Sequence, residues 1–404
     1  MTNRLLTPFR LLLVLVAVGL CATVLRPNLL ATMGLAFHRQ WFLDSYAVLA
    51  ANDAARTGLD ITEANPLDPL NRPHRYSDWW LGLRHLGLTR EDNFLFGGLC
   101  GLAFLGVTLA TVRPRTYAES AVLAVVLLSP PWLFGLQRAN NDLVIFAVLG
   151  AGLLALRRTA TPLRLAALGV AIVLATGLKY FPIVAAAALL VALPWWKAVR
   201  WTFGLTLVTS LFVLWTERNS ISRGVFEMPA TIFEFGAPVL WRDLALGAKA
   251  MLALAVTLLA AGAALFVARR WTTGLADEAR GPAGERLMFA VGALILLGCF
   301  AAGVSHIYRW VFSLWLWPWL WREVAAHRGV ARGALMLWLA SIWADGLLCL
   351  VVNSTGAAYR PALGWRVVTQ SATWVLMALL AGWLLEGFIA QARAWRAGDR
   401  PVSA

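Results

Sequence analysis

The chain has 404 residues, of which 60% are hydrophobic and 14% are charged, and its mean hydropathy is +0.69. Soluble domains carry about 45–50% apolar and about 25% charged residues, so this composition excludes a disordered chain, a fibre and an ordinary soluble enzyme. Thirty-five Lys and Arg residues against 21 Asp and Glu residues give a net charge of +14, which is high for a membrane protein. The composition predicts an all-α, polytopic integral membrane protein with a surplus of basic residues.

A helix that crosses the hydrocarbon core of a membrane needs about 20 mostly apolar residues. Apolar runs bounded by charges predict about twelve crossings (roughly 10–13) in a single domain that covers residues 1–404. The predicted crossings are 8–25, 93–112, 118–136, 142–156, 163–178, 182–196, 201–216, 245–268, 287–304, 310–321, 333–352 and 367–390.

Two of these assignments have alternatives. Residues 8–25 are interpreted as an uncleaved anchor because no convincing small-residue cleavage site follows them, whereas a signal peptide is the alternative. Lys179 to Pro182 interrupt the pair 163–178 and 182–196, which could also be one broken helix or a re-entrant pair.

The distribution of basic residues predicts the orientation, because Lys and Arg in short loops favour the cytoplasm. Nineteen of the 35 fall on the face that holds both termini, and nine fall on the opposite face outside the long loop 26–92. We therefore predict a multi-pass protein of a bacterial inner membrane with cytoplasmic termini. Loop 26–92, called the first loop below, would be periplasmic, and its length and aromatic content favour an ordered structure.

The first loop contains the acid with the clearest catalytic potential. Leu43, Ala47 and Ala50 have the spacing of one apolar helix stripe, and Asp44 lies on the adjoining face, pointing toward whatever the stripe leaves unburied. A carboxylate near the mouth of a membrane cavity can act as a general base. The alternative is a structural one, in which Asp44 is the N-cap of a helix over 45–56.

A second polar group follows the Ser-Pro-Pro break at 129–131. Arg138, Asn140, Asn141 and Asp142 are predicted to lie in a short turn between two crossings. Asp142 could simply cap the following helix. Charged side chains at membrane depth are costly, however, and are by default candidates for function.

Three further cationic or titratable residues lie at interruptions of apolar runs. Lys179 must extend to the interface, pair with an acid or hold an anionic ligand. His306 and Arg309 are one helical turn apart and could share a face, or they could belong to an interfacial anchor with their Tyr and Trp neighbours. Together with a carboxylate, these groups suit a ligand with a phosphate head and a lipid tail.

Several short motifs recur in a fixed order over most of residues 38–320. They are Asp-x-Tyr at Asp44 and Tyr46, Gly-Leu-Asp at 58–60, Tyr76 before the second crossing, SPP…QRANND, the Lys-Tyr-Phe-Pro break, and Ser-His…Tyr-Arg before a Trp/Pro-rich run. In this order the chain resembles the type C membrane glycosyltransferases (GT-C). In particular, it resembles the glycosyltransferase family 87 group of polyprenyl-phosphate-mannose-dependent mannosyltransferases.

This resemblance implies a GT-C-like fold and an inverting hexosyltransferase with its active site on the periplasmic side. A hexosyl group, with mannose the expected sugar, would move from a polyprenyl-phosphate donor to a lipid or glycan acceptor. Asp44 would be the general base, and Lys179, His306 and Arg309 would hold the donor phosphate. The residues expected to shape the site are Tyr46, Tyr76, Arg138, Asn141 and Asp142. No metal, cofactor or nucleic acid is expected, and the partners are the donor, the acceptor and membrane lipids.

Two other function classes fit the composition. A transporter or flippase of an anionic lipid or solute would need access from both faces but no general base. An O-antigen-type glycan polymerase or ligase would use a diphosphate-linked donor in place of a monophosphate.

Overall fold

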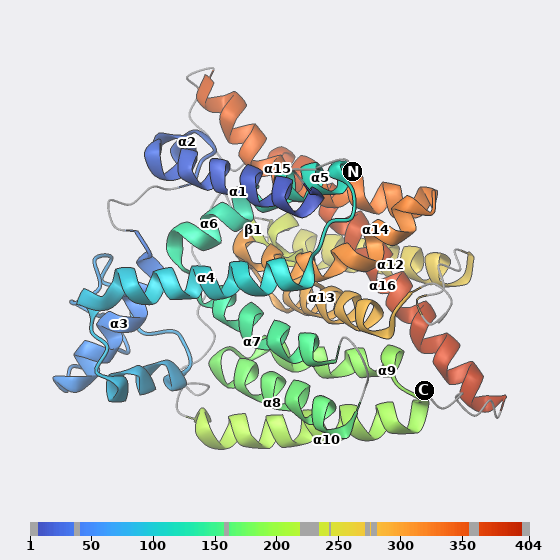
Figure 1. Cartoon of the computed structure of the whole chain (residues 1–404), viewed down its shortest axis with the longest axis horizontal. Coiled ribbons are helices and arrows are strands. Elements are labelled where there is room, and N and C mark those ends of the chain that lie inside the picture. The colour runs from blue at the N-terminus through green and yellow to red at the C-terminus, as the bar shows by residue number, and fades with distance from the viewer. Residues whose placement is uncertain are drawn as a thin grey trace, which may run out of the picture.

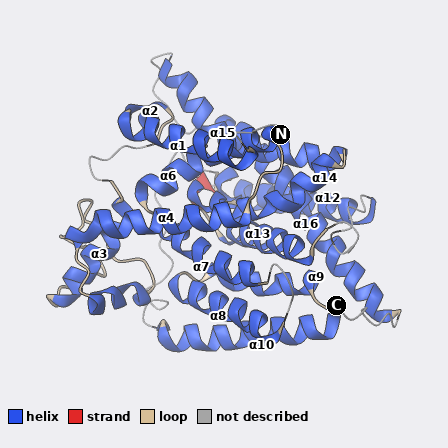
Figure 2. Cartoon of the chain, viewed as in Figure 1, coloured by secondary structure: helices blue, strands red, loops and turns tan. Residues whose placement is uncertain are grey.

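The computed structural model describes residues 7–35, 41–156, 161–218, 234–241, 244–270, 275, 281–354 and 363–397. These residues are helical almost throughout (Figure 2). The strands among them are one antiparallel pair of two residues each, β1 (Glu234–Phe235) and β2 (Ser305–His306), and the longest described segment without helix or strand is 57–77. The all-α class is therefore confirmed.

The helices of the first half include four in the first loop and a sharp break at 129–131. In chain order they are α1 (Pro8–Leu25), α2 (Asn28–Thr32), α3 (Leu43–Arg56), the 3-10 helices η1 (Asp78–Leu86) and η2 (Arg90–Asp92), α4 (Asn93–Thr111), α5 (Tyr117–Leu127), α6 (Pro130–Arg138), α7 (Asn141–Ala155) and α8 (Pro162–Leu178).

The second half contains longer helices and two extended 3-10 segments. In chain order, the helices of this half are η3 (Phe181–Ala188), α9 (Leu189–Ala192), α10 (Trp195–Thr216), η4 (Ala237–Leu240), α12 (Leu246–Arg270), α13 (Ala283–Ala302), η6 (Ile307–Leu316), α14 (Trp317–Ala325), α15 (Gly329–Ser354) and α16 (Leu363–Arg396).

The described helices identify a multi-pass membrane protein. Seven are long and apolar enough to cross a membrane, namely α1, α4, α10, α12, α13, α15 and α16. The count rises to eight if α5 and α6, which meet at a bend of 55°, form one broken span. Three further apolar segments, α7, α8 and the run Phe181–Ala192, are shorter. Each predicted crossing overlaps a helix, but the number twelve stays a prediction.

The predicted crossings 163–178 and 182–196 are interrupted at Lys179 to Pro182, and the structure shows the backbone geometry of that interruption. Lys179, with extended backbone at φ −165°, ends α8, and the next segment begins as a 3-10 helix at Phe181 and Pro182. Helices α8 and η3 pack on each other, and the number of crossings over 163–196 stays a prediction. Residues 310–321 are likewise divided between the 3-10 helix η6 and α14.

Helix α4 defines the long direction of the bundle. Its first residue, Asn93, accepts a hydrogen bond from Ser45 Oγ at 2.7 Å and donates one to the Trp41 carbonyl at 2.9 Å, so α3 lies at this end. Figure 1 shows α3 beyond one end of α4, with α7, α8 and α10 stacked along one side of it. At a rise of 1.5 Å per residue, the 19 residues of α4 span about 28 Å.

Both ends of the described chain lie at the end of the bundle away from α3. Ser120, near the start of α5, donates to the Pro8 carbonyl at 2.7 Å. The Trp395 ring packs on the ring of Trp195, the first residue of α10, at 6.1 Å. The other end of α10 contacts Trp79 of the first loop, so Trp395 lies far from that loop. That this end faces the cytoplasm stays a prediction from the loop charges.

The core of the bundle is unusually aromatic. Seven Trp side chains are fully buried, and they come mostly from η6, α14, α15 and α16: Trp132, Trp310, Trp315, Trp317, Trp319, Trp338 and Trp383. Helix α13 lies among them and packs against η3, η6, α14 and α16. Since lipid tails are as apolar as Leu, membrane helices associate through close packing, and large interlocking rings supply that packing here.

The described part of the first loop is ordered, as predicted; residues 36–40 lie outside the described residues. Ala51, Ala54 and Ile61 form a small core of their own. Asn52 ties α3 to η1, because its amide donates to the Trp80 carbonyl at 2.9 Å and accepts from the Arg84 N–H at 2.7 Å. The segment therefore folds as a cap on one end of the bundle.

We predict that Gly177→Ala destabilises the protein by about 1–3 kcal/mol, because a Cβ at this position would overlap the Trp79 ring. The far side of that ring contacts Phe212, and its N–H is bonded to Thr216, which limits its freedom to move. Gly98→Ala is the control, since a Cβ there meets nothing within 4 Å, and it should be neutral or stabilise by up to about 1 kcal/mol. Thermal unfolding of the purified, detergent-solubilised variants checks this, and equal melting temperatures would contradict it.

Candidate functional site

Asp44 lies in the first turn of α3 rather than before it. The chain enters the helix through Phe42, whose φ of +61° is left-handed and whose N–H donates to the Gln137 carbonyl at 2.9 Å. Helix α3 begins at Leu43, so the alternative in which Asp44 is the N-cap is wrong. The expectation that Asp44 faces unburied surroundings is also wrong, because its carboxylate is only 2% exposed and the neighbours on its face are buried.

The Asp44 carboxylate accepts four hydrogen bonds from three side chains. Oδ1 accepts from Arg72 Nη1 at 3.0 Å and from Arg138 Nη2 at 2.6 Å. Oδ2 accepts from Arg138 Nε at 2.9 Å and from Asn140 Nδ2 at 2.7 Å. An ionised carboxylate offers about four acceptor positions, so all of them are occupied. A substrate hydroxyl can reach Asp44 only by replacing one of these donors.

The protonation states of the first-loop groups follow from these contacts. Burial by itself would raise the pKa of Asp44, but the charges and hydrogen bonds of Arg138, the charge of Arg72 and the Asn140 amide outweigh it and hold the pKa well below its usual range. Burial and the negative charge of Asp44 raise the pKa of Tyr76 well above 10.0. At neutral pH Asp44 is therefore an anion, and the neighbouring Tyr76 keeps its proton.

A second buried carboxylate lies at the start of α7. Asp142 is fully buried, and its Oδ1 accepts from Lys179 Nζ at 2.6 Å while its Oδ2 lies 3.9 Å from Arg309 Nε. Asn140 is the N-cap of α7, since its side chain accepts from the Asp142 N–H at 3.0 Å. The alternative in which Asp142 caps this helix is therefore wrong. Its carboxylate is instead paired with two cations.

The corner between α6 and α7 holds buried polar atoms without partners. Ala139, with φ of +44°, makes the sharp turn that joins the two helices. Asn141 Nδ2 and both amide atoms of Gln137 are buried and make no hydrogen bond with the described residues. Leaving such atoms unpaired costs about 1–3 kcal/mol each, and groups of this kind need an explanation such as a bound ligand or water.

Aromatic rings connect the two carboxylate sites. The Arg138 guanidinium lies 5.3 Å from the Phe134 ring centre, and the Tyr308 ring is 6.0 Å from that of Phe134. Lys179 Nζ lies 5.6 Å from the Tyr308 ring, and the Arg309 guanidinium lies 4.7 Å from the ring of Phe181. Such contacts hold cations in place without neutralising them.

His306 lies in a strand and not on a helix with Arg309. It lies in β2, where it is paired with Glu234, and its ring is 5.3 Å from Tyr308 and 6.2 Å from Phe134. Arg309 is inside η6, which begins after His306, so the predicted shared helix face is wrong. The structure thus brings Lys179 and Arg309 together on Asp142 and places His306 in the adjoining aromatic group.

The two tyrosines predicted to shape the site differ in their contacts. Tyr76 interacts electrostatically with Asp44 and belongs to its surroundings. Tyr46, half-buried on α3, makes no side-chain hydrogen bond or ring contact with the described residues. The sequence did not single out Arg72, which also pairs with Asp68 at 2.9 Å. No local pattern distinguishes Arg72 from the other basic residues of the first loop.

Within the described ranges, no three His, Cys, Asp or Glu side chains gather closely enough to hold a metal ion. Comparison with protein-family models, with curated proteins and with solved structures found no match. The site consists of two buried carboxylates, four cations and a set of aromatic rings.

We predict that Asp44→Asn destabilises the fold by about 3–5 kcal/mol, because it leaves the partly buried Arg138 without its charge partner and Arg72 with Asp68 alone. Asp53→Asn on the same helix is the matched control. Asp53 pairs with Arg56 nearer the surface, so its loss should cost about 1 kcal/mol or less. Thermal unfolding of both purified variants measures the difference, and equally small losses would show that the Asp44 network contributes little to stability.

Proposed function

We propose that the protein is a membrane glycosyltransferase that moves a hexosyl group, with mannose the expected sugar, from a polyprenyl-phosphate donor to a lipid or glycan acceptor. The proposal includes a GT-C-like fold with about twelve crossings, counting the short and broken helices. It also places the active site on the periplasmic side of a bacterial inner membrane. The arrangement of Lys179, Arg309 and Asp142 at the α6–α7 corner is the observation that supports it most directly.

The charge balance of the site suits a phosphate. Lys179 and Arg309 share one carboxylate, that of Asp142, so this group has one excess positive charge. Arg72 and Arg138 share Asp44, and Asp68 takes part of the charge of Arg72. Four cations therefore face three carboxylates. A phosphate leaving group bound beside Lys179 and Arg309 would be stabilised as its negative charge develops.

The unpaired polar atoms suit the same substrate. Asn141 Nδ2 can donate to a phosphate or sugar oxygen, and the Gln137 amide can both donate and accept. Phe134, Phe181 and Tyr308 provide the apolar walls against which a sugar ring or an isoprenoid can pack. The corner thus offers polar contacts for a head group next to apolar surface for a tail.

In the proposed reaction Asp44 is the general base. The acceptor hydroxyl oxygen attacks the anomeric carbon as the bond from that carbon to the phosphate oxygen breaks, and the hydroxyl proton passes to Asp44. The acceptor hydroxyl reaches Asp44 by replacing the Asn140 amide, the one neutral donor among its contacts. The polyprenyl phosphate leaves with the bonding electrons, and the anomeric configuration inverts.

We predict that the purified protein transfers mannose from polyprenyl-phosphate mannose to a bacterial membrane-lipid extract. Lys179→Met should reduce transfer by about 100-fold, since it removes a cation that stabilises the leaving phosphate. Lys197→Met, which removes an exposed lysine near the start of α10, should leave the rate unchanged. Mannosylated product is measured by mass spectrometry of the extracted lipids.

The donor and the product distinguish the competing functions. Transfer only from diphosphate-linked donors would overturn the proposal in favour of a polymerase or ligase. Movement of lipid-linked sugar across proteoliposomes without any glycosidic product would identify a transporter. An unchanged rate in folded Lys179→Met protein would remove Lys179 from the donor-phosphate site.

We also predict that Arg72→Met moves the acid limb of kcat/KM to higher pH. Burial raises the pKa of Asp44 and the positive charge of Arg72 lowers it. Removing that charge therefore raises the pKa of Asp44. A general base is active when ionised, so activity is lost as the pH falls through this raised pKa, whereas the wild-type pKa lies below the usual carboxyl range. Arg90→Met, in the same loop and more exposed, is the control. Superimposable pH profiles for all three proteins would mean that Asp44 is not the base.

A further inference from the structure

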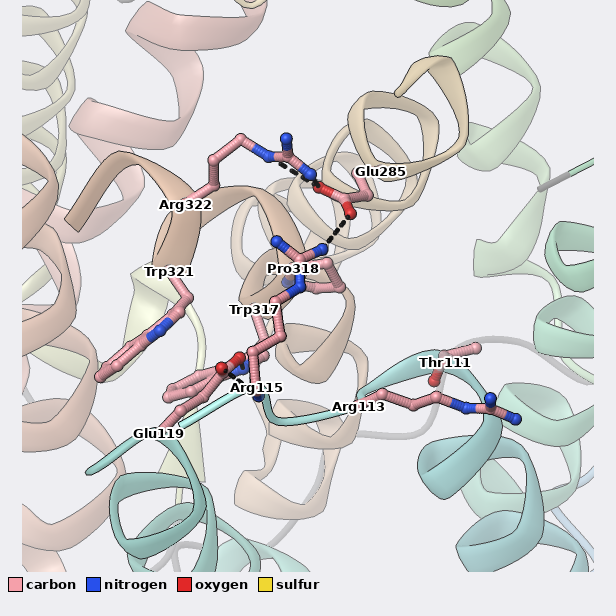
Figure 3. Close-up of a pocket in the computed structure, with 9 residues that line it drawn as sticks. All are labelled: Thr111, Arg113, Arg115, Glu119, Glu285, Trp317, Pro318, Trp321 and Arg322. Atoms are coloured by element: carbon pink, nitrogen blue, oxygen red, sulfur yellow. Dashed lines mark hydrogen bonds and ion pairs between the residues drawn. The ribbon is translucent and has the colours of Figure 1, made fainter. Parts of the chain in front are cut away.

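A second polar pocket lies at the other end of α4 from Asp44. Its walls come from the α4–α5 connection, the start of α13, and α14 (Figure 3). Its empty volume is ≈ 330 Å³, part of it open to the outside. The 19 residues of α4 separate it from Asn93 beside the Asp44 site by about 28 Å. Since the hydrocarbon core of a bilayer is about 30 Å thick, the pocket lies at the opposite membrane interface.

The pocket contains more cations than acids. Arg113, Arg115 and Arg322 line it together with two carboxylates, those of Glu119 and Glu285. Figure 3 shows Arg115 and Arg322 both directed at Glu285. Arg115 Nη2 lies 3.2 Å from one Glu285 oxygen, and Arg322 Nε donates to the other at 3.0 Å. One positive charge is left over.

The second acid is already committed to other partners. Glu119 Oε1 accepts from Trp317 Nε1 at 3.0 Å, and its Oε2 accepts from the Arg115 backbone N–H at 2.7 Å. Glu119 also lies in the first turn of α5, where the helix dipole favours a negative charge. Glu119 therefore has a structural role and forms no ion pair with Arg113.

Donors remain unused at the opening of the pocket. Arg113 is exposed and makes no hydrogen bond or ion pair with the described residues. The Arg115 side chain is 67% exposed and uses one guanidinium nitrogen for Glu285. A guanidinium carries five N–H donors in a planar fork that matches phosphate oxygens. The opening thus presents two forks with free donors.

An aromatic wall adjoins these cations. The Trp317 and Trp321 rings stack at 4.9 Å with an angle of 17° between their planes. Trp and Tyr are enriched at the level of lipid headgroups, and basic pockets between transmembrane helices bind anionic lipid headgroups. A phosphate flanked by an acyl glycerol would meet arginine donors on one side and indole surface on the other.

We propose that this pocket binds the phosphate of an anionic phospholipid in the leaflet opposite the Asp44 site. The proposal rests on the surplus charge and on the unused Arg113 and Arg115 donors, and it does not depend on the proposed glycosyltransferase activity. Binding leaves the Glu285 ion pairs in place, because the donors that contact the phosphate are those that Glu285 does not use.

The test measures retained lipid. Full-length protein in detergent is titrated with phosphatidylglycerol, and bound lipid is counted by native mass spectrometry. Each arginine near a charged lipid contributes about 1 kcal/mol, so Arg113→Gln should weaken phosphatidylglycerol binding about fivefold. Arg113 has no structural contact to lose, so this variant should fold normally. Arg200→Gln, an exposed arginine on α10 outside the pocket, should bind as the wild type does.

Three results would overturn the proposal. Equal weakening by Arg113→Gln and Arg200→Gln would show a general surface charge effect. Equal retention of phosphatidylcholine would remove the requirement for an anionic lipid. Displacement of the lipid by inorganic phosphate, added at the same molar concentration as the lipid, would identify a site for free phosphate instead.

Discussion

The packing of α3 and the first loop on the bundle depends on one buried charge, the carboxylate of Asp44. It lies on α3, and its partners are Arg72 in the first loop, Arg138 at the end of α6 and Asn140 at the start of α7. A charge buried without partners would be very costly, so α3 can pack on the bundle only when these donors are in place. The folding of the first loop is thereby coupled to the α6–α7 corner.

Asn140 extends this coupling to the second carboxylate. Its amide nitrogen donates to Asp44, and its carbonyl oxygen caps α7 by accepting from the Asp142 N–H. One side chain thus sets the spacing between the two acids. In the proposed reaction the acceptor hydroxyl replaces the Asn140 bond to Asp44, whereas the Asn140 bond that caps α7 stays in place.

The two ends of the bundle use basic residues in different ways. Beside α3 the cations are partly buried and paired with carboxylates, as Lys179 is with Asp142. At the far end of α4 the arginines are exposed and only partly paired, as Arg113 and Arg115 show. The net charge of +14 therefore includes both a few buried cations with a local role and a larger exposed set that can meet anionic lipid.

The sequence by itself determined the all-helical class, the approximate helix positions and several of the charged residues that the structure brings together. These depend on local properties: the length of apolar runs, the breaks at prolines such as Pro130, and the cost of placing charges such as Arg138 and Lys179 at membrane depth. Only the tertiary structure decided that Arg72 joins Asp44, that Asn140 rather than Asp142 caps α7, and that His306 lies in a strand and not on a helix face with Arg309. Those outcomes depend on contacts between residues 28 to 96 positions apart or on backbone dihedral angles at a single residue, and hydrophobic periodicity carries no information about either.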